Sequence, residues 1–199
     1  MYYKVFSYFW YNVVCFNGIN DVDGCEKLRN TLERRLKYLY SGELTSTIGF
    51  IIVSYVFNLA YPNLHLYSLL SFWISFFLLE FLLLQGTYYW YSKLKRLRTE
   101  KISITPIKTI LQLQRFKKLN KIVIVLAVLA FIVDFVKWYL SLPIWGISLA
   151  AFIFIFAILE YINYFYIQLS YDNLSDIRYL LKVKKLKKSC ISKDFERIT

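Results

Sequence analysis

The alternation of long apolar stretches with basic segments predicts four helices that cross a membrane. A span needs about 20 predominantly apolar residues. Four stretches reach or approach that length, namely 44–61, 66–91, 122–140 and 144–168. Short turns at 62–65 and 141–143 would join them into two hairpins. We therefore expect an all-α integral membrane protein whose transmembrane helices form a four-helix bundle.

Each hairpin carries an acidic residue at a matching place in its second span. The motif Leu-Glu-aromatic occurs as Leu79-Glu80-Phe81 and as Leu159-Glu160-Tyr161. The acid follows the proline of its turn, Pro62 or Pro143, by 18 residues in the first hairpin and 17 in the second. One interpretation is a parallel repeat of two related hairpins. The other is that any aromatic-rich hairpin ends this way, because aromatic side chains concentrate at membrane interfaces.

The segment before the first hairpin, 1–43, is expected to hold two elements. An aromatic stretch at 2–16 is too short to span, and it either lies on the membrane surface or packs on the bundle. An amphipathic helix follows, with leucines at helical spacing. The capping-box pair Asp23 and Glu26 predicts its start, and Ser41-Gly42 predicts its end.

Two further basic segments separate and follow the hairpins 44–91 and 122–168. The segment 92–121 is expected to be a loop that contains a helix, with Thr105 as its cap and Pro106 at its first position. The tail 169–199 is expected to contain another basic helix from about Ser175.

Composition excludes a water-soluble protein, and the distribution of charge orients the spans. Hydrophobic residues make up 58% of the chain and aromatic residues 20%, in uncharged runs that a soluble domain does not need. The net charge is +12, and 24 of the 25 lysines and arginines lie in 1–43, 92–121 and 169–199. Because positive charge stays on the cytoplasmic side, we expect both termini and the central loop in the cytoplasm and the protein in the plasma membrane.

The same pattern suggests partners. It favours the lipid bilayer, with anionic lipids of the inner leaflet, over nucleic acid as the partner of the basic segments. Candidate lipid contacts are Arg34, Arg35, Lys37, Lys184, Lys185, Lys187 and Lys188. Small residues on a helix let another backbone come close. Two helix faces with such residues are therefore expected to pack against other helices. A homo-oligomer or a membrane-protein partner is expected on the same ground. These faces contain Ala127, Ala130, Gly146, Ala150 and Ala157.

Five polar side chains lie at or near membrane depth, namely Glu80, Asp134, Lys137, Glu160 and Asn163. A charge in hydrocarbon costs on the order of 3 kcal/mol, so each needs a partner or a function. Asp134 and Lys137 are three residues apart on one helix and are expected to pair with each other. Glu160 is expected either to bind Asn163 or Tyr164 as structural glue or to form part of an ion site.

The sequence lacks the motifs of catalysis and of metal binding. It contains no nucleophile elbow, no zinc-protease motif and no glycine-rich phosphate loop. The single histidine, His65, cannot supply paired ligands to haem or zinc. Cys15, Cys25 and Cys190 fall in the expected cytoplasmic segments and are expected to be reduced thiols. We therefore expect no catalytic residue, no metal and no cofactor.

Three short stretches carry a resemblance to a known group. They are Phe16-Asn17-Gly18-Ile19, Asp23-Gly24-Cys25-Glu26 and Gln168-Leu169-Ser170-Tyr171-Asp172-Asn173. In these stretches the chain resembles uncharacterised small four-span membrane proteins of Gram-positive bacteria. The resemblance covers most of the chain and implies a bacterial membrane protein with four spans, but it carries no function that could be transferred.

Three functions are compatible with this sequence. The favoured hypothesis is a non-enzymatic membrane protein that acts by self-association or as a subunit of a larger membrane complex. The alternative is a small proton- or cation-coupled transporter or channel that uses the intramembrane acids Glu80 and Glu160. A third hypothesis is an enzyme that acts on lipid head groups at the inner leaflet. Its only support is the segment 17–35, which carries both acidic and basic residues.

Overall fold

The computed structural model describes residues 22–141, 143–169 and 186–198. Its long helices are α2 (Val22–Ala60), α3 (Leu70–Glu100), α4 (Ile107–Lys137) and α5 (Ile144–Phe165). The short helices of the described residues are η1 (Pro62–Leu64), η2 (Leu66–Ser68) and α7 (Cys190–Glu196). By length and composition, all four long helices could cross a membrane. The prediction of a helical chain with four apolar helices is thus confirmed.

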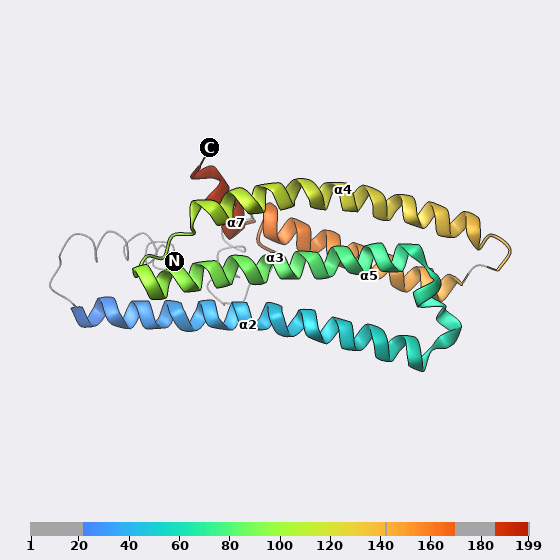
Figure 1. Ribbon diagram of the computed structural model, residues 1–199, viewed down its shortest axis with the longest axis horizontal. Helices are drawn as coiled ribbons and strands as arrows, with labels where there is room; N and C mark the ends of the chain where they lie inside the picture. Colours follow the sequence, from blue (N-terminus) through green and yellow to red (C-terminus); the bar gives the residue numbers. More distant parts are fainter. Residues whose placement is uncertain (1–21, 142, 170–185, 199) are drawn as a thin grey trace.

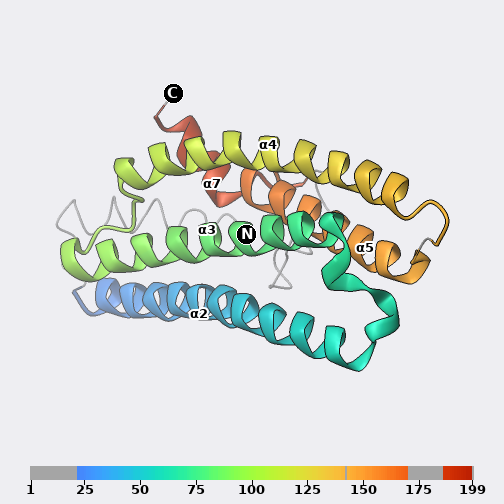
Figure 2. The same cartoon turned by 45° about the vertical axis from the view of Figure 1, so that its right-hand side comes forward.

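Helix α3 lies in the middle of the arrangement. It packs against α2 on one side and against α4 and α5 on the other, as Figure 1 and Figure 2 show. Its large side chains, such as Leu78, Leu82 and Tyr89, are completely buried. By contrast, α4 and α5 contact each other only over a short stretch. The two hairpins therefore pack differently, which does not favour the interpretation as a parallel repeat.

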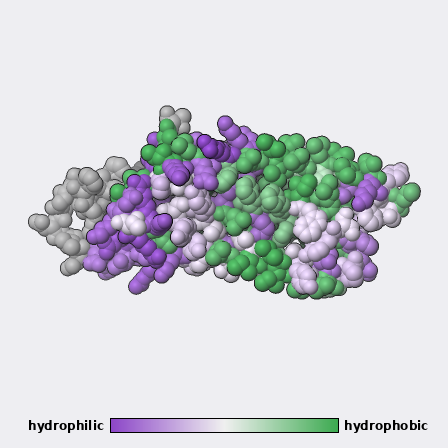
Figure 3. Space-filling view, in the orientation of Figure 1, coloured by the Kyte–Doolittle hydropathy of each residue, from purple (hydrophilic) through white to green (hydrophobic). Residues whose placement is uncertain are grey.

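The two ends of the molecule differ in polarity. Hydrophilic residues gather where α2 begins, α3 ends and α4 begins, whereas hydrophobic residues gather over the other half of the molecule, whose far end is mixed (Figure 3). We call the hydrophilic end the basic end, and its described lysines and arginines lie in 27–37, 93–101, 108–121 and 187–197. The opposite end, formed by η1, η2 and residues 138–141, is called the turn end.

The course of α2 corrects one predicted boundary. The helix does not end at Ser41-Gly42 but continues through this pair. A single glycine inside a helix costs only about 1 kcal/mol relative to alanine, and α2 is packed on both sides of it. Leu36 lies in a buried cluster with Leu94 of α3, and Phe50 contacts Phe156 of α5 edge-to-face. The expected basic helix and the first span are therefore one element of 39 residues.

The basic segment 92–121 is not a loop with a helix of its own. Helix α3 continues to Glu100 and α4 begins at Ile107, so that only residues 101–106 connect them. The hydroxyl of Thr105 does not cap α4, because it donates a hydrogen bond to Asp194 at 2.5 Å. Pro106 is the N-cap residue and makes no side-chain hydrogen bond. Helices α3 and α4 therefore continue without a break beyond their apolar stretches.

Other predicted boundaries shift by a few residues. The second span begins at Leu70, because residues 62–68 form two 3₁₀ turns with His65 in the left-handed conformation between them (φ 48°). The fourth span ends at Phe165 instead of residue 168, and Asp23 lies in the first turn of α2 instead of before it. The aromatic stretch 2–16 and the helix expected from Ser175 lie outside the described residues.

The first turn of α3 is capped by another helix. The residue before it, Leu69, has no side chain that could accept a hydrogen bond. The carboxylate of Asp134 in α4 accepts hydrogen bonds from the N–H groups of Leu70 (3.1 Å) and Ser71 (2.7 Å). Asp134 is 1% exposed, and the positive end of the helix dipole also favours an anion there. The structure thus gives Asp134 other partners than the expected Lys137, whose Nζ lies 5.9 Å from the centre of the Trp138 ring.

We expect Asp134→Ala to lower the free energy of unfolding in detergent by about 1–3 kcal/mol, because it leaves two buried backbone donors without partners. Lys137→Ala is the matched control. If the carboxylate serves α3 and not Lys137, this exposed change should cost less than about 0.5 kcal/mol. Equal losses in both variants, measured by denaturant titration, would instead support the Asp134–Lys137 pair.

Candidate functional site

Four polar side chains, one from each long helix, lie at a similar depth. Glu43 precedes the end of α2 by 17 residues, and Asn120 precedes the end of α4 by 17. Gln85 follows the start of α3 by 15 residues, and Glu160 follows the start of α5 by 16. At 1.5 Å per residue, each lies about 23–26 Å from the turn end of its helix. We call these four residues the polar layer. Each needs a partner, because an unpaired polar group in an apolar environment is costly.

Gln85 and Asn120 satisfy each other. Gln85 Nε2 donates to Asn120 Oδ1 at 3.0 Å, and Asn120 Nδ2 donates to Gln85 Oε1 at 2.9 Å. Both side chains are buried. Such a pair holds α3 against α4 in the way that polar side chains join membrane helices. Sequence reasoning missed the pair, because only Gln85 lies inside a predicted apolar stretch, whereas Asn120 stands among the lysines of the basic segment 92–121.

The other two residues of the polar layer, Glu43 and Glu160, lie between α2 and α5. Together with their neighbours Asn163 and Tyr164 they form a group that we call the acid seam. Asn163 Nδ2 donates to Glu160 Oε2 at 3.3 Å, and Asn163 Oδ1 accepts the N–H of Leu169 at 2.8 Å. Glu43 lies close enough to Glu160 for the two charges to act on each other. Sequence reasoning did not single out Glu43, because it stands just before the first predicted span.

The Tyr164 side chain fills the seam from the α5 side. It is 7% exposed, and its hydroxyl lies beside the Glu43 carboxylate in a geometry that completes no hydrogen bond. The hydroxyl is also pressed against α3. A Cβ atom added at Gly86 would stand 2.6 Å from the Tyr164 oxygen, so only glycine leaves the ring its place.

Glu80 is not part of the acid seam. Both of its carboxylate oxygens are buried, and neither has a hydrogen-bond partner in the described part of the chain. The acid that acts electrostatically on Glu43 of the seam is Glu160 and not Glu80.

The small residues expected at helix contacts are all buried. They are Ala127, Ala130, Gly146, Ala150 and Ala157. Gly146 leaves room for the backbone carbonyl of Leu64, Ala150 lies in the core near the turn end, and Ala157 lies in the main core. These residues therefore serve packing within one chain.

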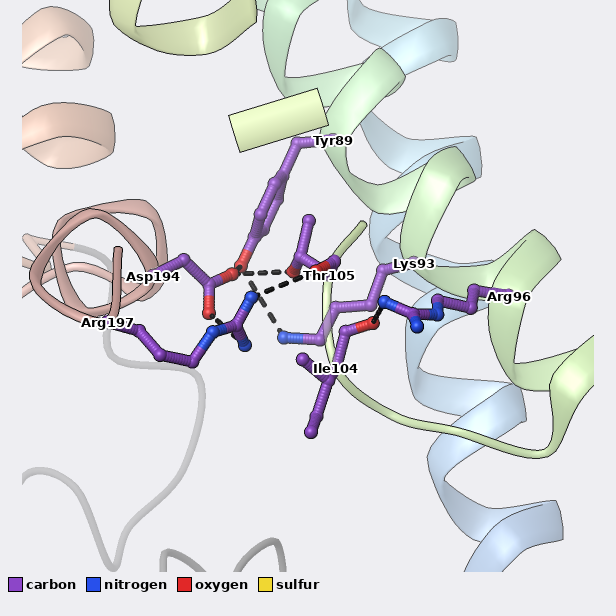
Figure 4. Close-up of polar contacts among 7 residues, drawn as sticks. All are labelled: Tyr89, Lys93, Arg96, Ile104, Thr105, Asp194 and Arg197. Atoms are coloured by element: carbon purple, nitrogen blue, oxygen red, sulfur yellow. Dashed lines mark hydrogen bonds and ion pairs between the residues drawn. The ribbon is translucent and has the colours of Figure 1, made fainter. Parts of the chain in front are cut away.

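Asp194 of α7 joins three parts of the chain at the basic end (Figure 4). Its Oδ2 atom accepts hydrogen bonds from the hydroxyls of Tyr89 (2.8 Å) and Thr105 (2.5 Å). Arg197 lies 3.4 Å from Oδ1 and donates to the Thr105 carbonyl at 2.9 Å. Lys93 donates to the Tyr89 hydroxyl at 3.4 Å. A single acid thus ties α7 to α3 and to the connection between α3 and α4. Sequence reasoning missed it, because one acid in a basic tail looks like a solvated charge.

Apolar and backbone contacts complete the docking of α7. Phe195 stacks on Phe165 with ring centres 6.1 Å apart, and Ile191 is 3% exposed. Ser189 Oγ donates to the carbonyl of Tyr164 at 2.6 Å and also accepts the N–H of Ser192 as the cap of α7. The described C-terminal residues are therefore an integral part of the basic end.

The candidate lipid contacts among the described residues lie at the same end. Arg34, Lys37 and Lys188 are exposed, Arg35 and Lys187 are half-buried, and Lys184 and Lys185 lie outside the described residues. Lys188 forms an ion pair with Glu196. At the turn end, an open groove of about 480 Å³ is lined mainly by Phe57, Tyr61, Trp145 and Phe152.

Neither the groove at the turn end nor the polar layer contains the side chains that covalent catalysis needs. The lining of the groove contains no titratable side chain beyond Tyr61, and the polar layer contains no nucleophile next to a base. The described residues contain no group of three or more histidine, cysteine or acidic side chains that could hold a metal ion. The segment 17–35, on which the enzyme hypothesis rests, lies partly outside the described residues.

Comparison with known proteins adds no relative, since no family model, no curated protein and no solved structure matches the chain. The resemblance to small four-span proteins of Gram-positive bacteria therefore stays a prediction. Function has to be argued from the geometry of the chain itself.

We expect Asp194→Ala to weaken the docking of α7 by about 1–3 kcal/mol, because the hydroxyls of Tyr89 and Thr105 lose their shared acceptor. Amide hydrogen exchange at residues 186–198 should then rise roughly tenfold or more, since 1.4 kcal/mol corresponds to a factor of ten. Glu196→Ala is the control from the same helix. Its ion pair with Lys188 is more than half exposed, so exchange should change little.

Proposed function

We propose that this chain is a non-enzymatic integral membrane protein that acts by self-association through α2. The observation that carries the proposal is a contrast among four glycines. Gly86 and Gly146 are used inside the chain, where a Cβ atom would collide with Tyr164 and with the Leu64 carbonyl. At Gly42 and Gly49 of α2, a Cβ atom would meet nothing within 4 Å. These two glycines therefore have no packing role within one copy.

The two open glycines belong to a stripe of small side chains. Residues 42, 46, 49 and 53 recur at helical spacing on one flank of α2, and they are Gly42, Ser46, Gly49 and Val53. Lipid tails are as apolar as leucine, so membrane helices associate by close packing instead of by the hydrophobic effect. A stripe without bulky side chains lets a second helix approach closely, whereas the large apolar residues around it suit lipid.

A second copy of the chain is the occupant that fits this stripe. In a two-fold dimer the same surface supplies both sides of the contact, so one small-residue stripe meets another. The internal small residues, such as Ala150 and Ala157, are already buried by the chain's own helices. The flank of α2 is therefore the place where a further helix can come near.

The proposal also includes an orientation. The basic end collects nearly all the positive charge of the described chain, and Lys137 alone of the described lysines and arginines lies near the turn end. The positive-inside rule then places the basic end in the cytoplasm, with Arg34, Arg35 and Lys37 near anionic lipid. The dimer would present two such basic ends side by side.

We expect Gly49→Ile to weaken self-association at least about tenfold, equivalent to about 1.4 kcal/mol, because bulk on the stripe keeps two helices apart. The measurement is energy transfer between labelled copies in lipid bilayers over a range of protein-to-lipid ratios. Ile51→Phe is the control. It also adds bulk to exposed α2 surface, but residues two apart lie on nearly opposite sides of a helix. A wild-type protein that stays monomeric at every ratio would overturn the proposal.

A second function has one observation in its favour, which is the unpartnered carboxyl of Glu80. Acids inside a membrane commonly mark ion or proton pathways. If the chain is a small proton- or cation-coupled transporter, Glu80→Gln should insert and fold normally yet lose most of the flux in proteoliposomes. Glu100→Gln, an exposed acid on the same helix that pairs with Arg96, should keep it. Absence of flux in the wild type would rule this function out.

A further inference from the structure

The nine acidic residues whose side chains the structure describes fall into three groups. Five form ion pairs with lysine or arginine, namely Glu26, Glu33, Glu100, Asp194 and Glu196. Asp134 caps the first turn of α3. Glu43, Glu80 and Glu160 form no ion pair within the described residues, although the chain as a whole has a net charge of +12. Two of these three, Glu43 and Glu160, face each other in the acid seam.

The geometry of α2 and α5 brings the two acids together. The helices run in opposite directions, and Phe50 of α2 contacts Phe156 of α5 with ring centres 6.0 Å apart. From this contact toward the basic end, seven residues along α2 lead to Glu43, and four to eight residues along α5 lead to Glu160 and Tyr164. The electrostatic effect of Glu160 on Glu43 agrees with this register. Two like charges so placed repel each other, and either a proton on one carboxyl or a cation between the two relieves the repulsion.

A second observation at the same place concerns Tyr164. Its side chain is more than nine-tenths buried, and its hydroxyl oxygen is buried without completing a hydrogen bond in the described part of the structure. The carboxylates of Glu43 and Glu160 both lie close enough to act on this hydroxyl electrostatically. A buried hydroxyl without a partner is costly. A cation in the seam could bind a lone pair of the Tyr164 hydroxyl oxygen.

A third observation is the end of α5. Glu160, Asn163 and Tyr164 lie in its last turn and a half, where the helix dipole places partial negative charge. No basic residue occurs in that last turn. Lys117 lies over the ring of Tyr166, just beyond the end of α5, at 4.2 Å from the ring centre. The dipole, the two carboxylates and the phenol oxygen thus make one negative site between α2 and α5.

We propose that the acid seam binds a hard cation from the aqueous side of the basic end, with Glu43, Glu160 and Tyr164 as oxygen ligands. Carboxylate and hydroxyl oxygens suit Na⁺, K⁺, Mg²⁺ or Ca²⁺ and do not suit metals that prefer sulfur or imidazole. Both acids are only half-buried, so the ion has a route to water. Because one ligand comes from α2 and two come from α5, the ion joins helices that otherwise contact mainly α3. This inference does not depend on self-association.

The test measures thermal unfolding of the purified full-length chain in detergent at constant ionic strength. The chloride salts of Na⁺, K⁺, Mg²⁺ and Ca²⁺ are each compared with that of N-methylglucamine, a cation too large for the seam. We expect at least one small cation to raise the unfolding temperature saturably, because a ligand that binds only the folded state stabilises it. The same unfolding temperature in every salt would overturn the proposal.

Variants assign the effect to the seam. Glu43→Gln and Glu160→Gln should each remove the ion-dependent rise in unfolding temperature. Tyr164→Phe should keep the rise but increase the half-saturating ion concentration. Glu26→Gln, an exposed acid of α2 paired with Arg29, should behave as the wild type. A rise that persists in both seam variants would place the ion elsewhere and overturn the assignment. Equilibrium dialysis of the wild type with ²²Na⁺ or ⁴⁵Ca²⁺ gives a direct reading should a variant fail to fold.

Discussion

The contact between the Asp134 carboxylate and the first turn of α3 is the one on which the rest of the arrangement depends. The first turn of a helix leaves backbone N–H groups without partners inside the helix, and where they are buried they need an acceptor from elsewhere. Helix α3 has no capping side chain of its own, so α4 supplies one from a distant part of the sequence. This fixes where α3 begins and how α4 lies beside it. The other helices then pack on α3, which carries most of the core.

The same constraint accounts for the other polar side chains of the helices. Gln85 and Asn120 satisfy each other, and Glu160 is held by Asn163. Both contacts give polar groups a partner, and the pair of Gln85 and Asn120 also joins α3 to α4. The groups left without a partner then become informative. Among them are the carboxyl of Glu80 and the hydroxyl of Tyr164, and these are places where a proton, an ion or another molecule has a reason to bind.

The basic end is built as an extension of the helices and not as a separate domain. At 1.5 Å per residue, α2 is about 58 Å long, whereas the hydrocarbon core of a bilayer is about 30 Å thick. Helix α2 is therefore about twice as long as one crossing requires, and α3 and α4 are also longer than a crossing needs. Asp194 and the aromatic side chains of α7 hold the C-terminal residues against these extensions. Any contact made at the basic end is thus rigidly connected to the helices at membrane depth.

The sequence by itself determined the class of the protein and the number of its apolar helices. Span length and hydrophobicity are local properties, so they can be read directly from composition along the chain. The helix ends were read less well, because Ser41-Gly42 looks like a stop in isolation and is overridden by packing on α3. Asn163 could be named as a partner of Glu160, since residues three apart share a helix face.

Only the tertiary structure decided which distant residues meet. Asp134 reaches the backbone of Leu70 and Ser71, Tyr89 and Thr105 share Asp194, and Glu43 faces Glu160. Each of these contacts depends on the rotation and register of one helix against another. The physical reason is that a helix presents several faces, and the hydrophobic pattern of an almost uniformly apolar span does not say which face meets which neighbour.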